Sequence, residues 1–391
     1  MGSSRGGRGR DDGTTLRRAR RAVPVTRVLV APDKFKGSAD AAEVASALAR
    51  GLRTAGAEAV ELPVADGGDG TVAAALAAGW APETVTVSGP TGEPVATTFA
   101  RRGVDAVVEM ADACGMRRLD GPLAPMAASS RGLGDVIAAA IADGAMRVVV
   151  GIGGSASTDG GAGMVSALGA RVRDAAGAPV PAGGAGLADV ASLDLDGLDL
   201  AGVTLEVACD VDNPLTGPEG AAAVYAPQKG ADLEQVRTLD AVLTRWADVV
   251  ASTTGRDLRD AAGAGAAGGV GFAAVALLGA RLRSGADLVL DLVGLDAALD
   301  EVDLVITGEG AFDEQTLRGK APAVVAGRAR ARGVPVVVVC GRTTLSPARA
   351  RAEGFAEVLA LTDLESDPHR CMADAPQLLE RMGRAVGARF L

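Results

Sequence analysis

The stretch RVVVGIGGSASTDGGAG, residues 147–163, decides the expected fold. Its three consecutive valines predict a short buried strand, because a β-branched run of this length suits a sheet that is covered on both faces. A loop rich in glycine and hydroxyl residues follows, and residues 164–170 then have helical character. The N–H groups of a glycine-rich loop and of a helix N-terminus can together bind an anion. We therefore expect this loop to bind phosphate.

The composition indicates an α/β protein. A chain of 391 residues favours two domains, and its hydrophobic content of 48% with only 2% aromatic residues predicts a core built from Ala, Val and Leu. The 54 glycines, together with alternating strand and helix patterns, favour an α/β fold with tight turns.

The charge distribution excludes some functions. The net charge is −10, although residues 1–26 carry seven arginines against two aspartates, so the rest of the chain is more acidic still. An acidic chain of this kind is unsuited to bind the phosphate backbone of nucleic acid. Residues 1–26 lack the apolar core of a secretory signal, and we expect them to be a disordered extension. No uncharged apolar run of about 18 residues is present, so no membrane span is expected.

The four scattered cysteines, without CxxC spacing, favour reduced thiols in a cytoplasmic protein.

Lysine is rare in this chain and has a distinctive context. Only four of the 39 basic residues are lysine, and each lies within two residues of Gly or Pro in loop-like sequence. A lysine ammonium is a compact, rotatable charge suited to a phosphoryl oxygen, whereas arginine is a planar fork. We expect at least two of them to be functional, against the alternative of chance surface positions: Lys34, Lys36, Lys229 and Lys320.

The strand pattern predicts a discontinuous domain with an insertion. Two early and three late strands predict one five-stranded parallel sheet: 28–31, 59–65, 303–307, 334–341 and 356–362. The expected division is a Rossmann-like domain of residues 27–66 and 291–391, with residues 67–290 as an inserted α/β domain that carries the glycine-rich loop.

Local patterns add smaller expectations. Residues 83–109 read as short antiparallel strands, and residues 182–200 as a loop. Residues 41–51 are expected to form a helix that ends at its glycine. The DGGxG pattern at 66–70 recurs at 159–163, each time before a helix, which suggests two walls of one cleft.

Acidic loops follow several predicted strands. Ligands of open α/β sheets bind at the carboxyl ends of strands, where carboxylates can hold Mg²⁺ or accept a proton from a hydroxyl. The single histidine, His369, lies in no motif, so a Ser/His/Asp or Cys/His site is not expected. The acidic residues are Asp33, Asp66, Asp69, Asp210, Asp212, Glu309 and Asp313. For Asp66, Asp69 and Asp159, helix capping is the structural alternative.

The glycine-rich loop also permits a different function. Gly151, Gly153 and Ala156, with Asp174 after the next strand, imitate a dinucleotide fingerprint. An NAD(P)-dependent oxidoreductase therefore stays an alternative, as does a non-enzymatic protein that binds small acids. Against the fingerprint, residues 157–163 separate it from the first helical residue, and no GxxxxGK[ST] motif is present.

Seven motifs in order resemble the type I glycerate kinase family. They cover nearly the whole chain except its arginine-rich start: VLVAPDKFKGS (28–38), LPVADGGDGT (62–71), VEMADACGM (108–116), GIGGSASTDGGAGM (151–164), CDVDNPLTGPEGAAAVYAPQKGA (209–231), GAGAAGGVG (263–271) and VITGEGAFDEQTLRGKAP (305–322). The family's PDSFKGS-type loop has Lys34 here in place of Ser, so this position departs from the family's pattern.

The resemblance implies a Rossmann-like fold with a large inserted domain and ATP-dependent phosphorylation of D-glycerate with Mg²⁺. The implied product is 2-phosphoglycerate rather than 3-phosphoglycerate. A small-molecule substrate is the only partner expected, without nucleic acid or membrane, and we keep a homodimer as a candidate assembly.

The residue roles are hypotheses. The phosphates of ATP would be bound by Gly153, Gly154, Ser155, Ser157, Thr158, Gly160 and Gly161. Lys229 or Lys36 would neutralise a phosphoryl oxygen, and Asp66 or Asp159 would accept the hydroxyl proton. The metal ligands would be Asp210, Asp212 and Glu309. The substrate would be bound by Asp69, Lys320 and Arg318, with loop N–H groups as the alternative to Arg318 for its carboxylate.

Overall fold

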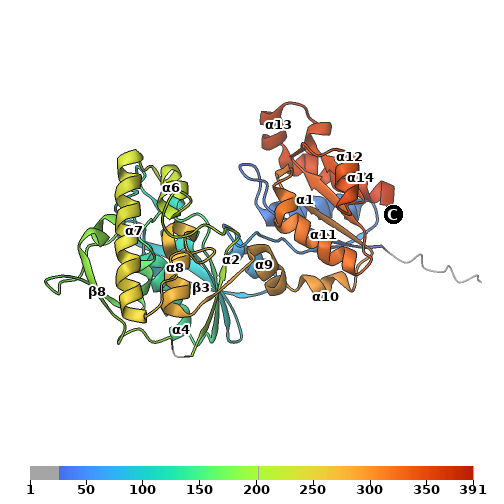
Figure 1. Ribbon diagram of the computed structural model, residues 1–391. Coiled ribbons are helices and arrows are strands. Elements are labelled where there is room, and N and C mark those ends of the chain that lie inside the picture. The colour runs from blue at the N-terminus through green and yellow to red at the C-terminus, as the bar shows by residue number, and fades with distance from the viewer. Residues whose placement is uncertain (1–25, 201, 391) are drawn as a thin grey trace, which may run out of the picture.

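The computed structural model describes residues 26–200 and 202–390, and Figure 1 shows them as two lobes, each built around one sheet. Apart from Thr26, the extension expected to be disordered lies outside the described residues.

The first lobe holds a five-stranded sheet in which all pairs are parallel, as predicted from the sequence. Valine-rich runs form its buried strands, because both faces of the sheet are covered. In the spatial order β15-β13-β11-β1-β2, the strands are β15 (Glu357–Ala360), β13 (Val336–Cys340), β11 (Leu304–Gly308), β1 (Arg27–Pro32) and β2 (Glu58–Glu61).

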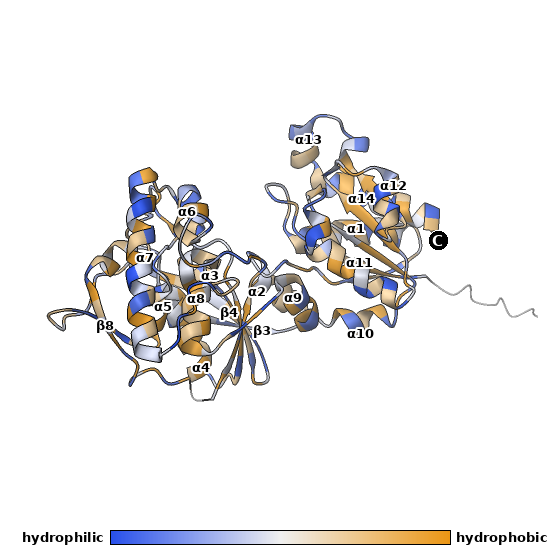
Figure 2. Cartoon of the chain, viewed as in Figure 1, coloured by the Kyte–Doolittle hydropathy of each residue, from blue (hydrophilic) through white to orange (hydrophobic). Residues whose placement is uncertain are grey.

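Helices cover both faces of this sheet. Val28 and Val30 of β1 belong to one hydrophobic cluster with α1 (Ala41–Thr54) and α14 (Ala375–Phe390). Leu29 and Ala31 belong to the opposite cluster with α9 (Gly285–Val293) and α11 (Ala321–Ala331). Successive side chains of β1 thus point to opposite faces of the sheet, and each face packs against helices. Figure 2 shows the strands between these helices as hydrophobic.

Helices α1 and α14 pack closely through glycines. The prediction that the first helix ends at Gly51 is wrong, because α1 continues to Thr54. A Cβ atom on Gly51 would lie 2.1 Å from the carbonyl oxygen of Glu380, and one on Gly383 would lie 2.3 Å from that of Leu48. Gly51 therefore serves the close approach of two helices and does not cap one.

The second lobe holds a six-stranded mixed sheet. The antiparallel pairing expected within residues 83–109 is confirmed for β3, β4 and β5, after which β5, β6, β9 and β10 pair in parallel. In the order β10-β9-β6-β5-β4-β3, the strands are β10 (Arg281–Arg283), β9 (Thr204–Ala208), β6 (Arg147–Gly151), β5 (Asp105–Glu109), β4 (Pro94–Arg102) and β3 (Ala81–Ser88).

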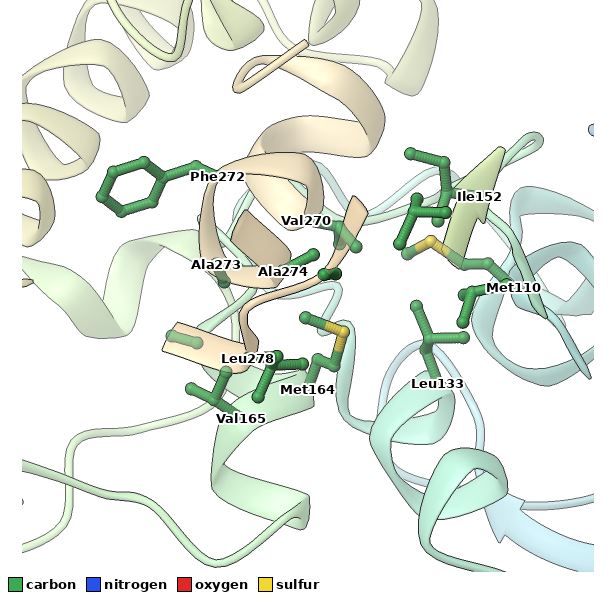
Figure 3. Packing of buried hydrophobic residues seen from close by; sticks show 14 of the residues in the cluster. Met110, Leu133, Ile152, Met164, Val165, Val270, Phe272, Ala273, Ala274 and Leu278 are labelled. Atoms are coloured by element: carbon green, nitrogen blue, oxygen red, sulfur yellow. The ribbon is translucent and has the colours of Figure 1, made fainter. Parts of the chain in front are cut away.

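One face of this sheet carries the largest hydrophobic cluster. Figure 3 shows Val270 and Leu278 of α8 (Ala266–Leu278) beside Met164 and Val165 of α5 (Ala162–Ala167). The cluster also includes side chains of α4 (Arg131–Ala142) and α7 (Leu233–Thr254). The opposite face packs against α2 (Thr71–Ala77) and α9, so α9 contributes to the cores of both lobes.

The expectation of a loop over residues 182–200 is wrong. Residues Gly184–Asp189 form the 3₁₀ helix η2, and β8 (Val190–Asp194) pairs antiparallel with β7 (Arg171–Asp174). Val190 and Leu193 are buried in the large cluster, so packing of these two apolar residues favours a strand in a segment rich in Gly and Asp.

The remaining elements are short. They are α3 (Met110–Cys114), η1 (Met116–Arg118), α6 (Ala221–Tyr225), η3 (Pro227–Lys229), α10 (Leu295–Leu299), β12 (Ala311–Phe312), η4 (Thr316–Arg318), β14 (Arg342–Thr343), α12 (Pro347–Ala352), η5 (Leu361–Asp363) and α13 (Pro368–Ala373). Among the described helices, none combines the length and apolar character that a bilayer crossing requires. The residue boundaries of the two domains stay a prediction.

Candidate active site

Three adjoining cavities lie where the carboxyl ends of strands from the two sheets meet. The central cavity, of about 860 Å³, shares Asp66, Gly153 and Gly154 with a glycine-lined cavity of about 350 Å³. It shares Asp33 and Asp69 with an acidic cavity of about 370 Å³. We call the three together the cleft.

Both sheets direct strand ends into this cleft. Asp33 follows β1 and Glu309 follows β11 in the five-stranded sheet, whereas Gly153 follows β6 and Asp210 follows β9 in the other. The carboxyl edge of a parallel sheet is where α/β proteins bind ligands. Here two such edges face one space, which suits a reaction between two bound molecules.

Two glycine loops meet in the cleft, but they are not the two that the repeated pattern indicated. A Cβ atom on Gly153 would lie 2.5 Å from the Cα atom of Gly68, so only glycine permits this approach of the two backbones. The loop at 66–70 therefore faces residues 151–154, and not residues 159–163.

The second half of the glycine-rich loop is structural. Ser157 and Thr158 are fully buried, and neither they nor Gly160 and Gly161 line the cleft cavities. A Cβ atom on Gly160 would lie 2.5 Å from a ring carbon of Trp246, whose indole N–H donates to the Gly160 carbonyl at 3.0 Å. The expectation that these four residues bind phosphate is corrected, since the loop turns inward after Ser155; Gly153, Gly154 and Ser155 remain on the surface of the cleft.

Asp159 is likewise a structural residue. Only 1% of it is exposed, and it accepts hydrogen bonds from the backbone N–H groups of Ser130, Gly161 and Gly163 and from the Ser130 hydroxyl at 2.9 Å. It does not line the cavities that contain Asp66. Its placement therefore does not favour the expected role as acceptor of a substrate proton, and its alternative as a capping residue fits its contacts.

All four lysines of the chain line the cleft. Lys34, Lys36 and Lys320 line the central cavity, and Lys229 lines the glycine-lined cavity. They come from three separate parts of the sequence, and the rest of the chain uses arginine. The structure thus gathers the four ammonium groups of the chain around one space, and their functional role stays a prediction.

Lys229 is the most deeply placed of the four. It is 2% exposed, and its ammonium donates to the Ser155 hydroxyl at 2.7 Å and to the Ser157 carbonyl at 2.6 Å. Burial lowers the pKa of Lys229 to about 7, although the charge of Asp159 opposes this shift. Lys229 thus holds the part of the glycine-rich loop that reaches the cleft.

Asp33 is a buried carboxyl group at the edge of the central cavity. It is 6% exposed, and burial raises its pKa to about 7, with a further contribution from the charge of Asp66. A carboxyl group with a pKa near neutrality is suited to accept a proton. Asp33 lies in one of the acidic loops of the sequence, but its sequence context indicates no role, because its burial is set by tertiary packing.

The three expected metal ligands do not converge. Asp210 lines the glycine-lined cavity and Glu309 the central cavity, whereas Asp212 is exposed and lines neither. Glu309 already accepts from Thr316 and from Lys320, the latter at 3.1 Å. Within the described residues, no group of three or more His, Cys, Asp or Glu side chains forms a metal site.

A pair of carboxylates nevertheless fits Mg²⁺ better than the expected triad. Asp66 and Asp210 line the same cavity, and the pKa of Asp210 is raised by burial and by the charge of Asp66. Mg²⁺ is usually held by one or two carboxylates together with waters and substrate phosphates, so a third protein ligand is not required.

The expected substrate-binding residues are only partly in the cleft. Asp69 and Lys320 line the central cavity, but Arg318 is exposed and lines none of the three cavities. Asp69 forms an ion pair with Arg117, which also contacts the buried Glu109 at 3.2 Å. Glu109 accepts from the N–H groups of Gly70 and Val72 and so fixes the 66–70 loop. Arg117 and Glu109 could not be linked to that loop from the sequence, since both are far from it in the chain.

Comparison with known proteins identifies the family. Residues 28–391 match the model of the glycerate kinase family. The chain belongs to the glycerate kinase family. It is 42% identical over 371 residues to a glycerate kinase of Bacillus subtilis, covering 93% of this chain and 97% of that protein. It is also 42% identical to a glycerate 2-kinase of Escherichia coli, with coverage of 81% and 86%.

A solved structure supports the same assignment. A protein of Salmonella typhimurium LT2, assigned as a glycerate kinase 2, superposes with a TM-score of 0.81 at 41% identity, covering 93% of this chain and 98% of that one. The family resemblance and the α/β fold expected from the sequence are confirmed, as is the enzyme class, an ATP-dependent kinase with an alcohol acceptor. The oxidoreductase and the non-enzymatic alternatives are set aside.

Proposed function

We propose that this enzyme transfers the γ-phosphate of ATP to the 2-hydroxyl of D-glycerate, giving 2-phosphoglycerate, and that the reaction takes place in the cleft. The observation that carries this proposal is the collection of all four lysines of the chain around one space that also contains Asp33 and Asp66. The name of the Escherichia coli relative supports the choice of the 2-hydroxyl.

Phosphate would be bound on the wall formed by the six-stranded lobe. Backbone N–H groups of Gly153, Gly154 and Ser155 are available where the loop reaches the cavity, and glycine lets a phosphate come close. Lys229 would keep this loop in position through Ser155 and add positive charge behind it.

Asp66 and Asp210 would hold Mg²⁺, which when bound neutralises charge on the phosphate oxygens. Asp33 would accept the hydroxyl proton of glycerate, because it lies on the opposite wall from the phosphate loop and its pKa of about 7 suits the task. Asp66, one of the two acceptors suggested by the sequence, is the second candidate because it borders both the glycine-lined and the central cavity.

The arrangement in two lobes agrees with this scheme. We propose the domain division given by the sequence, residues 27–66 and 291–391 against 67–290, with α9 at the junction because it contributes to both cores. A homodimer and a cytoplasmic location stay predictions from the sequence.

The test is an ADP-release assay with a series of small hydroxy acids, followed by phosphorus NMR of the product. A phosphate on C2 couples to one proton and gives a doublet, whereas a phosphate on C3 couples to two. We expect turnover with D-glycerate and a doublet. Turnover with a product phosphorylated on C3 would refute the regiochemistry, and the absence of ADP release with glycerate would refute the substrate.

A further inference from the structure

Two cationic side chains of the central cavity lack a counter-charge. Lys36 and Arg342 both line this cavity, and within residues 26–200 and 202–390 neither side chain makes a hydrogen bond or an ion pair. The other lysines of the cavity are engaged, since Lys34 donates to the carbonyl of Asp69 and Lys320 pairs with Glu309. The free cations are therefore available to a ligand.

These two residues lie on adjoining loops that are joined by Gly310. The backbone N–H of Arg342 donates to the Gly310 carbonyl at 3.0 Å, within the short parallel pairing of β12 and β14. On the other side, a Cβ atom on Gly310 would lie 3.3 Å from the backbone nitrogen of Lys36. The loops that follow β1, β11 and β13 thus form successive layers, with one unpaired cation on each side of the middle layer.

The surroundings make an anion the expected ligand. The central cavity contains several carboxylates, including Asp33, Asp66 and Asp69, which would repel an acidic substrate unless cations offset them. A guanidinium group presents two parallel N–H groups that match the two oxygens of a carboxylate. Arg342 with Lys36 beside it is therefore a suitable site for a small organic acid.

We infer that Lys36 and Arg342 bind the carboxylate of the substrate, an inference that rests on the proposed function. Lys36 follows Asp33 by three residues in the same loop, so a carboxylate held there brings the neighbouring hydroxyl toward the proton acceptor. The phosphates of ATP are the other anions in the reaction, and the glycine loop on the facing wall is the better site for them. Arg342 thus takes the role of binding the substrate carboxylate that was expected of Arg318. Lys36 binds the same carboxylate and does not contact the phosphoryl group, although the sequence had suggested that contact.

The inference is tested by steady-state kinetics of Arg342→Gln and Lys36→Gln. Loss of one charge-assisted interaction is expected to raise KM for D-glycerate by about 10- to 100-fold, and to leave KM for ATP within about twofold of the wild type. Arg342→Lys should recover part of the affinity. The matched control is Arg351→Gln, an exposed arginine of α12 that lines no part of the cleft and should leave both constants unchanged.

Calorimetry separates this inference from the proposed function. Titration of D-glycerate, with neutral glycerol as the comparison, measures binding even without turnover. Tighter binding of glycerate than of glycerol by the wild type, lost in Arg342→Gln, supports the inference. Unchanged binding of glycerate by Arg342→Gln would overturn the inference. A wild type that shows no preference for glycerate over glycerol would also overturn it, as would a rise in KM for ATP instead of KM for glycerate. Absence of turnover in a wild type that binds glycerate through Arg342 would refute the proposed function alone.

Discussion

The ammonium group of Lys229 donates a hydrogen bond to the hydroxyl of Ser155 at 2.7 Å, deep behind the glycine loop that borders the cleft. This contact joins two segments that are 74 residues apart in the sequence. It ties the position of the loop to a single buried charge, so the loop is held in place before any ligand arrives.

Replacement of Lys229 by Met should therefore disturb ATP binding more than folding. We expect kcat/KM for ATP to fall by about 100-fold, as for loss of a preorganised polar group, with an unchanged circular dichroism spectrum. Ser155→Ala, which removes one of the two acceptors, should have a smaller effect. Wild-type kinetics in Lys229→Met would contradict the anchoring role.

The same substitution should alter the pH dependence of stability. Lys229 has a pKa of about 7 in the folded protein and 10.5 as its ordinary value. Between these values the unfolded state binds more protons, so the free energy of unfolding of the wild type should rise relative to Lys229→Met as the pH increases from 7 to 10.5. Urea unfolding of both proteins across this interval measures the difference, and a constant difference would contradict the lowered pKa.

Asp33 should control the acidic limb of the rate profile. Because its pKa is about 7, kcat/KM for glycerate should fall about tenfold per pH unit at lower pH, where the carboxyl group is protonated. Asp33→Asn should lose turnover by about 100-fold or more, and should unfold at a higher temperature than the wild type at pH 8, because it buries no charge. A flat profile between pH 5.5 and 8 would make Asp66 the better candidate for the proton acceptor.

Asp159→Asn should lower stability without removing activity. The amide nitrogen would face backbone N–H groups that now donate to the carboxylate, and we expect a loss of about 2–4 kcal/mol in the free energy of unfolding. The matched control is Asp174→Asn, where a half-buried carboxylate accepts from Ala176 and Ala178 and the loss should be small. A stable but inactive Asp159→Asn protein would restore the catalytic role.

Two helical glycines, Gly51 in α1 and Gly327 in α11, provide a paired test of helix packing. Gly51→Ala should cost about 1–3 kcal/mol, because the added Cβ atom would lie 2.1 Å from a backbone oxygen. Gly327→Ala in α11 meets no atom within 4 Å and should stabilise the protein by about 0.5–1 kcal/mol. Thermal unfolding of both variants measures the contrast; equal shifts would show that helix propensity, and not contact, governs Gly51.

The five-stranded sheet could be predicted because its signal is local. Runs such as residues 336–340 are apolar along their whole length, and a short run of this kind bounded by turns suits a buried parallel strand. The strand β8 lacked such a signal, since of its five residues only Val190 and Leu193 are buried and the segment around it is rich in Gly and Asp.

The site was harder to predict than the sheet. The DGG patterns at Asp66 and Asp159 look alike in sequence, yet one borders the cleft and the other lies inside the lobe, because α4 and α5 cover Asp159. The lysines were found because their rarity is a property of the sequence itself. Arg342 was not found, since one arginine among many carries no such signal.

The restriction of lysine to one region gives the enzyme an unusual response to chemical modification. Apart from the α-amino group, a reagent selective for primary amines would find targets only around the cleft. Acylation followed by peptide mass spectrometry would then report occupancy directly, since a bound ligand shields the very positions that react.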